Sequence, residues 1–140
     1  MVGDLHETVR GFDASLPSAE QILDAYFAYL WSRCEETRGG FYLAEADGAP
    51  AGYLCLFARV VPSEPDQVEP HAFVSDLYVA PEFHRRGIGD ALMRVAEEAA
   101  RAQGVARLEL SVLARNAPAL QFYRKLGFAE RAVIMSKPLS

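Results

Sequence analysis

The sequence has few cysteines, a shortage of positive charge and no long apolar run. Its two cysteines, Cys34 and Cys55, form neither a CxxC pair nor another metal-ligand spacing, so we expect two buried thiols and no bound metal. No apolar stretch approaches the roughly 20 residues that a membrane helix needs, and the first residues lack the apolar core of a signal peptide. We therefore expect a cytoplasmic protein with no membrane partner.

The charge balance argues against a second class of partner. The chain has 19 acidic and 14 basic side chains, for a net charge of −5, whereas non-specific nucleic-acid binding needs a basic face. With 140 residues, of which 51% are hydrophobic, the chain can fold as a single domain, 1–140, around one packed core.

Two familiar nucleotide-binding motifs are also missing. The sequence contains no Gly-x4-Gly-Lys-Ser/Thr phosphate loop. The pair Gly87 and Gly89 lacks the third glycine of a dinucleotide fingerprint, because Leu92 occupies that position.

What the sequence does contain is an alternation of helical and strand patterns. It predicts a helix over 18–38, two strands within 41–60 joined by a turn at Asp47 and Gly48, a strand over 71–79, a helix closed by Gly104, a strand over 106–113, a short helix capped by Asn116 and ended before Gly127, and one or two closing strands within 128–139. The order indicates a mixed α/β fold, with a mixed central sheet flanked by helices. The segment 71–112 is predicted to be a strand–helix–strand crossover, which makes its two strands parallel.

The stretch HRRGIGDALMRVAEEAARAQG, residues 84–104, concentrates positive charge and glycine where a helix begins. A helix N-terminus presents unpaired N–H groups and partial positive charge, and glycine lets an anion approach the backbone closely. Arg85 and Arg86 add donors, so the stretch favours a phosphate site. The competing interpretation is an ordinary helix start with solvated arginines.

Two motifs together resemble the GCN5-related N-acetyltransferases. They are DLYVAPEFHRRGIGDALM, beginning at Asp76, and NAPALQFYRKLGF, beginning at Asn116. The resemblance implies the acyl-CoA N-acyltransferase fold, with acetyl-CoA between two splayed parallel strands, 71–79 and 107–113. It implies cofactor contacts from Leu77, Tyr78, Val79, His84, Arg85, Arg86, Gly87, Ile88, Gly89, Asp90, Asn116 and Tyr123. The family pattern has Gln or Arg at the place of His84, which is a departure.

The same resemblance suggests catalytic roles. Tyr123 is expected beside the cofactor sulfur as the acid for the leaving thiolate, although it could equally be a core residue. Asp76 is the candidate general base by its position in the strand, with Glu82, Glu69 and His71 as rivals. A carboxylate satisfied by neighbouring donors is the alternative interpretation of Asp76.

The expected reaction is direct attack of an amine of a small molecule on the acetyl thioester. A peptide or protein N-acetyltransferase and a non-catalytic acyl-CoA-binding regulator are the alternatives. Family members usually begin with a strand, and residues 1–17 show no clear one. The closing segment RAVIMSKPL is a candidate edge for a homodimer.

Overall fold

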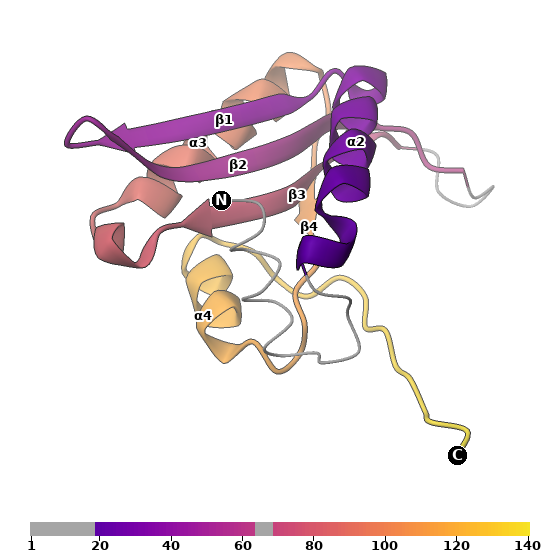
Figure 1. Ribbon diagram of the computed structural model, residues 1–140. Coiled ribbons are helices and arrows are strands. Elements are labelled where there is room, and N and C mark those ends of the chain that lie inside the picture. Colours follow the sequence, from indigo (N-terminus) through magenta and orange to yellow (C-terminus); the bar gives the residue numbers. More distant parts are fainter. Residues whose placement is uncertain (1–18, 64–68) are drawn as a thin grey trace.

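The computed structural model describes residues 19–63 and 69–140. Within these ranges, a sheet of order β1-β2-β3-β4 lies between two long helices, with a third helix beyond the last strand (Figure 1). The elements are α2 (Ala19–Thr37), β1 (Gly40–Ala46), β2 (Ala49–Val60), β3 (His71–Val79), the 3₁₀ turn η1 (Pro81–Phe83), α3 (Ile88–Ala102), β4 (Leu108–Leu110) and α4 (Ala117–Lys125). The predicted mixed α/β fold is confirmed. The predicted absence of a first strand concerns residues that lie outside the described ranges.

The helix α2 ends as its sequence predicts, but a different residue turns the chain. Arg38 takes the left-handed conformation, with φ 58°, and the Gly39 N–H donates to Cys34 O over 2.9 Å. Gly39 is required for another reason, because a Cβ there would lie 1.8 Å from Leu56 O. The glycine therefore allows the helix end to approach the sheet backbone.

The strands β1 and β2 form the predicted hairpin. Asp47 and Gly48 have φ values of 54° and 75°, the double left-handed turn that matches the twist of a two-residue hairpin. Antiparallel pairing runs from Gly40 opposite Leu56 to Ala46 opposite Ala49. The Asp-Gly signal predicted this turn correctly.

The crossover is also as predicted. β3 pairs antiparallel with β2 and parallel with β4, and α3 connects the two parallel strands. β4 is shorter than expected, with three residues in place of the predicted 106–113. Its pairing with β3 covers only Ala72–Val74.

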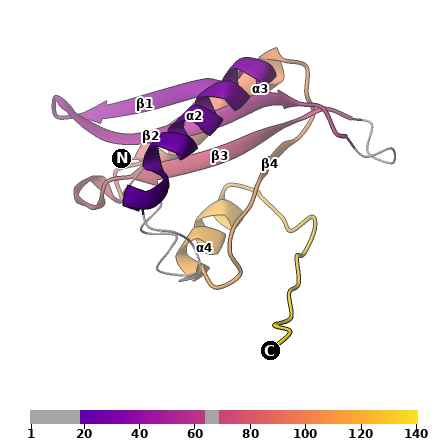
Figure 2. The ribbon, with the colours of Figure 1, turned by 45° about the vertical axis from the view of Figure 1, so that its right-hand side comes forward.

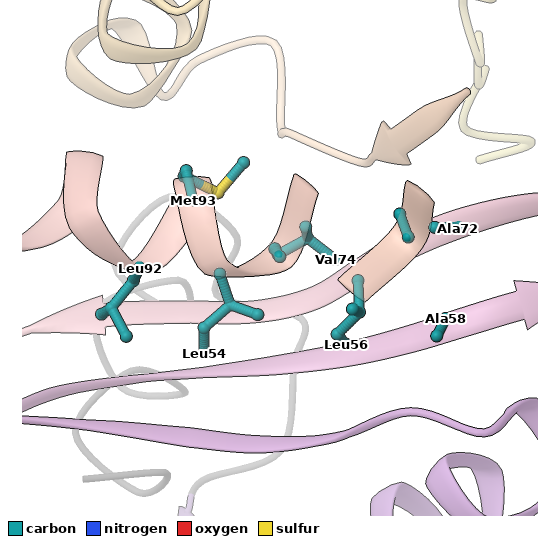
Figure 3. Packing of buried hydrophobic residues seen from close by; sticks show 9 residues of the cluster. Leu54, Leu56, Ala58, Ala72, Val74, Leu92 and Met93 are labelled. Atoms are coloured by element: carbon teal, nitrogen blue, oxygen red, sulfur yellow. The ribbon is translucent and has the colours of Figure 1, made fainter. Parts of the chain in front are cut away.

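Two cores form because the residues of β2 alternate between the faces of the sheet. Leu54 and Leu56 of β2 pack with Val74 of β3 against Leu92 and Met93 of α3 (Figure 3). On the other face, Cys55 and Phe57 pack with Leu30 and Cys34 of α2. In Figure 2, α2 lies across the front of the sheet and α3 behind it. Each buried leucine contributes about 2 kcal/mol relative to an exposed one.

The closing segment departs from the prediction. No strand forms within residues 126–140 of the described chain, and the prediction of one or two closing strands is wrong. Val133, Ile134 and Met135 are 73%, 94% and 89% exposed, and the segment leads away from the body (Figure 1). The segment makes no strand because it turns away from the sheet soon after Arg131 contacts Glu109 of the edge strand β4, and an apolar, β-prone pattern forms a strand only where it pairs.

Candidate active site

An extra residue in β3 marks the point where the two parallel strands part. Cys55 of β2 opposes Asp76, while the next residue, Leu56, opposes Val74, so Ser75 is left over as a β-bulge. The pairing of β4 with β3 stops at the same place, with Leu110 opposite Val74. Beyond Ser75, β3 continues to Val79, but β4 no longer pairs with it there.

Beyond the bulge, the main-chain N–H and C=O groups of β3 point alternately toward β2 and toward the open side that β4 has left. The Ala80 N–H donates to Ala51 O over 2.8 Å, and Tyr78 O faces β2 so closely that a Cβ at Gly52 would lie 2.5 Å from it. Since the groups of successive strand residues alternate, those of Leu77 and Val79 point to the open side. An added strand could therefore pair with Leu77 and Val79 there.

His84 lies at the end of this open side. Its Nε2 is 2.8 Å from Val79 O, so the imidazole contacts the outward carbonyl of the last β3 residue. His84, which departs from the family pattern, therefore contacts the end of β3.

The loop before α3 has the geometry of an anion cradle. Arg85 and Gly87 both take left-handed φ values, 64° and 76°, and alternating conformations of this kind turn successive N–H groups inward. The Ala91 N–H donates to Gly87 O over 3.0 Å at the start of the α3 ladder. The first-turn N–H groups of Ile88, Gly89 and Asp90 precede it and have no carbonyl partner within the helix. The residues present therefore fit the diphosphate of an acyl-CoA.

Arg86 is held by Asp47, a residue that the sequence analysis named only for its turn. Its guanidinium donates to both carboxylate oxygens of Asp47 over 2.8 and 3.4 Å and lies over the Phe83 ring, 5.5 Å from the centroid. The hydrogen bond and charge of Arg86 hold the pKa of Asp47 below its usual value. The tip of the β1–β2 hairpin is thereby tied to the cradle. The Asp-Gly pair signalled a turn, but nothing in the sequence signalled this partner.

Asp76 is the most enclosed acid of the site. It is 2% exposed, and both of its carboxylate oxygens accept from Tyr26 Oη, over 2.9 and 2.8 Å. It also accepts from Ser75 Oγ over 2.6 Å and from Tyr53 Oη over 3.3 Å. The alternative interpretation, a carboxylate satisfied by neighbouring donors, describes this geometry. Sequence reasoning identified Asp76 but missed its hydroxyl partners on α2 and β2.

Burial dominates the ionisation of the groups around Asp76. Desolvation, followed by the nearby Asp76 charge, raises the pKa of Tyr26 and of Tyr53 well above the usual value for a phenol. Burial also raises the pKa of Cys34, and burial together with the neighbouring Cys34 thiol raises that of Cys55. The two thiols are buried with their sulfurs 3.6 Å apart, which confirms the prediction of buried free cysteines.

The rivals to Asp76 lie elsewhere. His71 starts β3, five residues from Asp76 and so about 17 Å along an extended strand. Glu69 is an exposed residue before β3, and Glu82 is exposed in η1. Of the four candidate bases, only Asp76 adjoins the bulge.

The helix α4 carries the second predicted motif. The Asn116 side chain accepts from the Ala119 N–H over 3.3 Å, as predicted for an N-cap. Tyr123 packs edge-on between Phe122 and Phe128, with ring centroids 5.3 and 5.7 Å away. Burial raises the pKa of Tyr123 to about 12. Phe122 also reaches the cradle, because a Cβ on Gly89 would lie 3.0 Å from its ring.

The described part of the chain has neither a membrane-spanning helix nor a cluster of metal-binding side chains. No helix in 19–63 or 69–140 is both long and apolar enough to cross a membrane. No group of three or more His, Cys, Asp or Glu side chains in the same ranges could hold a metal ion.

Comparison with known proteins identifies the family. The profile of the Acetyltransferase (GNAT) family matches residues 6–128. An uncharacterised N-acetyltransferase of Methanocaldococcus jannaschii is 34% identical over 126 residues, which are 89% of this chain and 53% of that protein. The chain belongs to the GNAT acetyltransferase family.

Other relatives differ in what they act on. The streptothricin acetyltransferase of Streptomyces lavendulae is 42% identical over 89 residues, covering 64% of this chain and 43% of that protein. The ribosomal protein bS18 alanine N-acetyltransferase of Salmonella typhimurium is 34% identical over 125 residues, covering 84% and 77%. The chain spans about half the length of the first curated relatives that it matches.

A solved structure supports the fold. The aminoglycoside N-acetyltransferase AAC(6')-Iy in complex with CoA superimposes with a TM-score of 0.62 at 20% identity, covering 85% of this chain and 95% of that one. At this identity, the likeness concerns the fold.

Proposed function

We propose that the protein is an acetyl-CoA-dependent N-acetyltransferase that acetylates a primary amine of a small molecule by direct attack. Family membership supports the activity. The single observation that carries the proposal is the parting of β3 and β4 at Ser75, next to the enclosed carboxylate of Asp76 and on the strand that leads to the amide-lined cradle. The same proposal places the protein in the cytoplasm, since two free buried thiols suit a reducing compartment.

Acetyl-CoA supplies an activated acetyl thioester. The first-turn N–H groups of α3, together with Arg85, would hold its diphosphate, and the outward main-chain groups of Leu77 and the Val79 carbonyl would pair with its extended arm. Asn116 would contact the same arm from the start of α4. His84 contacts Val79 O, so we expect it to adjust when that carbonyl accepts a new donor.

The acceptor amine needs help to react. An alkyl amine with a pKa of about 10.4 is neutral in about one molecule in 2,500 at pH 7, a cost of about 4.6 kcal/mol. Asp76 is the proposed final base for the proton that the nitrogen releases. The Val79 N–H, on the open side, would stabilise the oxyanion, and Tyr123 would protonate the leaving thiolate.

The first experiment measures release of free thiol from acetyl-CoA with a panel of primary amines. We expect turnover with at least one small amine and none with the same amine already acetylated. Turnover with no small amine, although acetyl-CoA binds in isothermal titration, would contradict the proposal.

A peptide acceptor is the second candidate, because of the likeness to the bS18 alanine N-acetyltransferase. Peptides beginning with alanine, tested beside their N-acetylated counterparts, separate the two candidates. Faster turnover with such a peptide than with every small amine would favour the peptide function. Binding of acetyl-CoA without turnover on either class would favour the regulator.

A further inference from the structure

We propose that Tyr26 is the catalytic residue that contacts the acceptor nitrogen and passes its proton to Asp76. The inference rests on the proposed N-acetyltransferase function and deepens it. Asp76 is only 2% exposed, so it is too enclosed for a substrate to touch. Tyr26 is a half-buried residue, and its hydroxyl lies within 2.9 Å of both carboxylate oxygens.

The position of Tyr26 relative to the strand separation suits this role. The bulge at Ser75 turns Asp76 toward the α2 face of the sheet, where Tyr26 projects from α2 and Tyr53 from β2. The opposite face is covered by α3 and its apolar core. An amine that approaches the separation from the α2 face therefore meets Tyr26 before Asp76.

The three hydroxyls around Asp76 are not equivalent. Tyr53 is 4% exposed and 3.3 Å from the carboxylate, so it holds the acid without reaching a substrate. Ser75 binds only one oxygen, whereas Tyr26 binds both. Ser75 also hydrogen-bonds the Tyr26 hydroxyl. A hydroxyl oxygen has two acceptor lone pairs, so Tyr26 can accept an N–H beside Ser75 while it donates to Asp76.

Charge favours the same direction of proton transfer. Among the described residues, Asp76 is held by hydroxyls, and no basic side chain there forms an ion pair with it. As the C–N bond forms, the attacking nitrogen becomes positive, and a buried carboxylate stabilises that charge. Burial and the neighbouring Asp76 raise the pKa of Tyr26, so this residue transmits a proton and does not serve as a free phenolate.

The neutral amine attacks the acetyl carbon, the C–N bond forms, and the C–S bond breaks with its electron pair on sulfur. One nitrogen proton moves to Tyr26 Oη as the Tyr26 proton moves to Asp76. The thiolate takes a proton from Tyr123. Asp76 then returns its proton to solvent through Tyr26, and Tyr123 regains a proton from solvent, so both acids are restored and the net products are the amide and the free thiol of CoA.

The test compares four tyrosine and serine variants in full-length protein with the best amine of the panel. Tyr26→Phe keeps the ring and removes the hydroxyl, and we expect kcat to fall by about 100-fold, as for loss of one proton-transfer group, with the KM for acetyl-CoA unchanged. Tyr29→Phe, on the exposed side of the same helix, is the matched control and should retain activity. Tyr53→Phe and Ser75→Ala should lose less than Tyr26→Phe.

A double variant separates transmission from mere support of the fold. If Tyr26 acts through Asp76, then Tyr26→Phe combined with Asp76→Asn should be no slower than Asp76→Asn alone. Tyr26→Phe and Tyr53→Phe each remove a hydrogen bond to Asp76. Thermal unfolding of the two variants therefore shows whether the fall in kcat follows a fall in the stability of the protein.

Three results would overturn the assignment. They are unchanged kcat in Tyr26→Phe, a larger loss in Ser75→Ala than in Tyr26→Phe, and multiplying losses in the double variant. Each leaves the proposed function intact, because the unaltered protein still turns over. Failure of the unaltered protein on every amine, with acetyl-CoA bound, contradicts the proposed function itself.

Discussion

Tyr123 shows how much a single aromatic residue depends on its surroundings. Its ring lies between Phe122 and Phe128, and its hydroxyl is proposed to protonate the leaving thiolate. We expect Tyr123→Phe to lower kcat by about 10- to 1,000-fold, the span for one acid–base group or less. Isothermal titration should show nearly unchanged acetyl-CoA affinity. An unchanged kcat in an assay limited by chemistry would remove Tyr123 from the mechanism.

The ionisation of Tyr123 predicts how kcat depends on pH. Burial raises its pKa to about 12, so the acid form persists to higher pH than for an ordinary phenol near 10. In kcat profiles at saturating substrates, we therefore expect no alkaline loss from this group until the pH approaches 12. A loss centred near pH 10 that is absent in Tyr123→Phe would show that the hydroxyl titrates as if exposed.

Single residues also mark the limit of sequence reasoning about the site. Asp76 could be identified because it stands one position before the motif that pairs with the cofactor. Tyr26 is 50 positions away from Asp76, and its helical spacing indicates only a core face. A contact between a helix and a strand that far apart leaves no local pattern, so the hydroxyl partners of Asp76 appear only in the folded chain.

At the level of elements, the start of α3 offers a direct test of the cradle. Gly89→Glu places a carboxylate among the first-turn N–H groups, and we expect acetyl-CoA affinity to fall at least about tenfold, equivalent to about 1.4 kcal/mol. Isothermal titration measures this.

Gly89→Ala is the matched control for bulk. Its Cβ would come within 3.0 Å of the Phe122 ring, so it tests the packing of α4 against α3 without a charge. Equal losses of affinity in the alanine and glutamate variants would attribute the effect to that packing, and normal affinity in the glutamate variant would refute the cradle.

The elements predicted correctly are those with local signals. The Asp47-Gly48 turn and the Asn116 cap each depend on neighbouring residues, and each is present. The length of β4 and the fate of residues 128–139 depend on which strand edge is available, and these predictions failed. Strand pairing is non-local, so a correct alternation does not ensure a partner.

For the whole molecule, the exposed closing segment bears on assembly. We propose that it pairs with a second copy of the chain to form a homodimer, because Arg131 brings its start beside the edge strand β4 and three apolar side chains then project into solvent. Light scattering after size exclusion should give twice the mass of the chain, and Ile134→Asp should give the monomer. Ser136→Asp, in the same segment, is the control for added charge. A monomeric unaltered protein would contradict the dimer.

The bulge at Ser75 makes the face on which Asp76 lies depend on the number of residues in β3 as well as on their types. Ala72 and Val74 face α3, and unbroken alternation would send position 76 to that same apolar side. The extra residue reverses the phase, which is why Asp76 faces α2. Deleting Ser75 would restore regular pairing and leave the acid opposite Cys55 on the α2 face, whereas pairing Ser75 in place as an ordinary strand residue would turn the acid into the apolar layer against α3. Relatives that differ in length at this position should therefore be compared by strand phase before their carboxylates are equated.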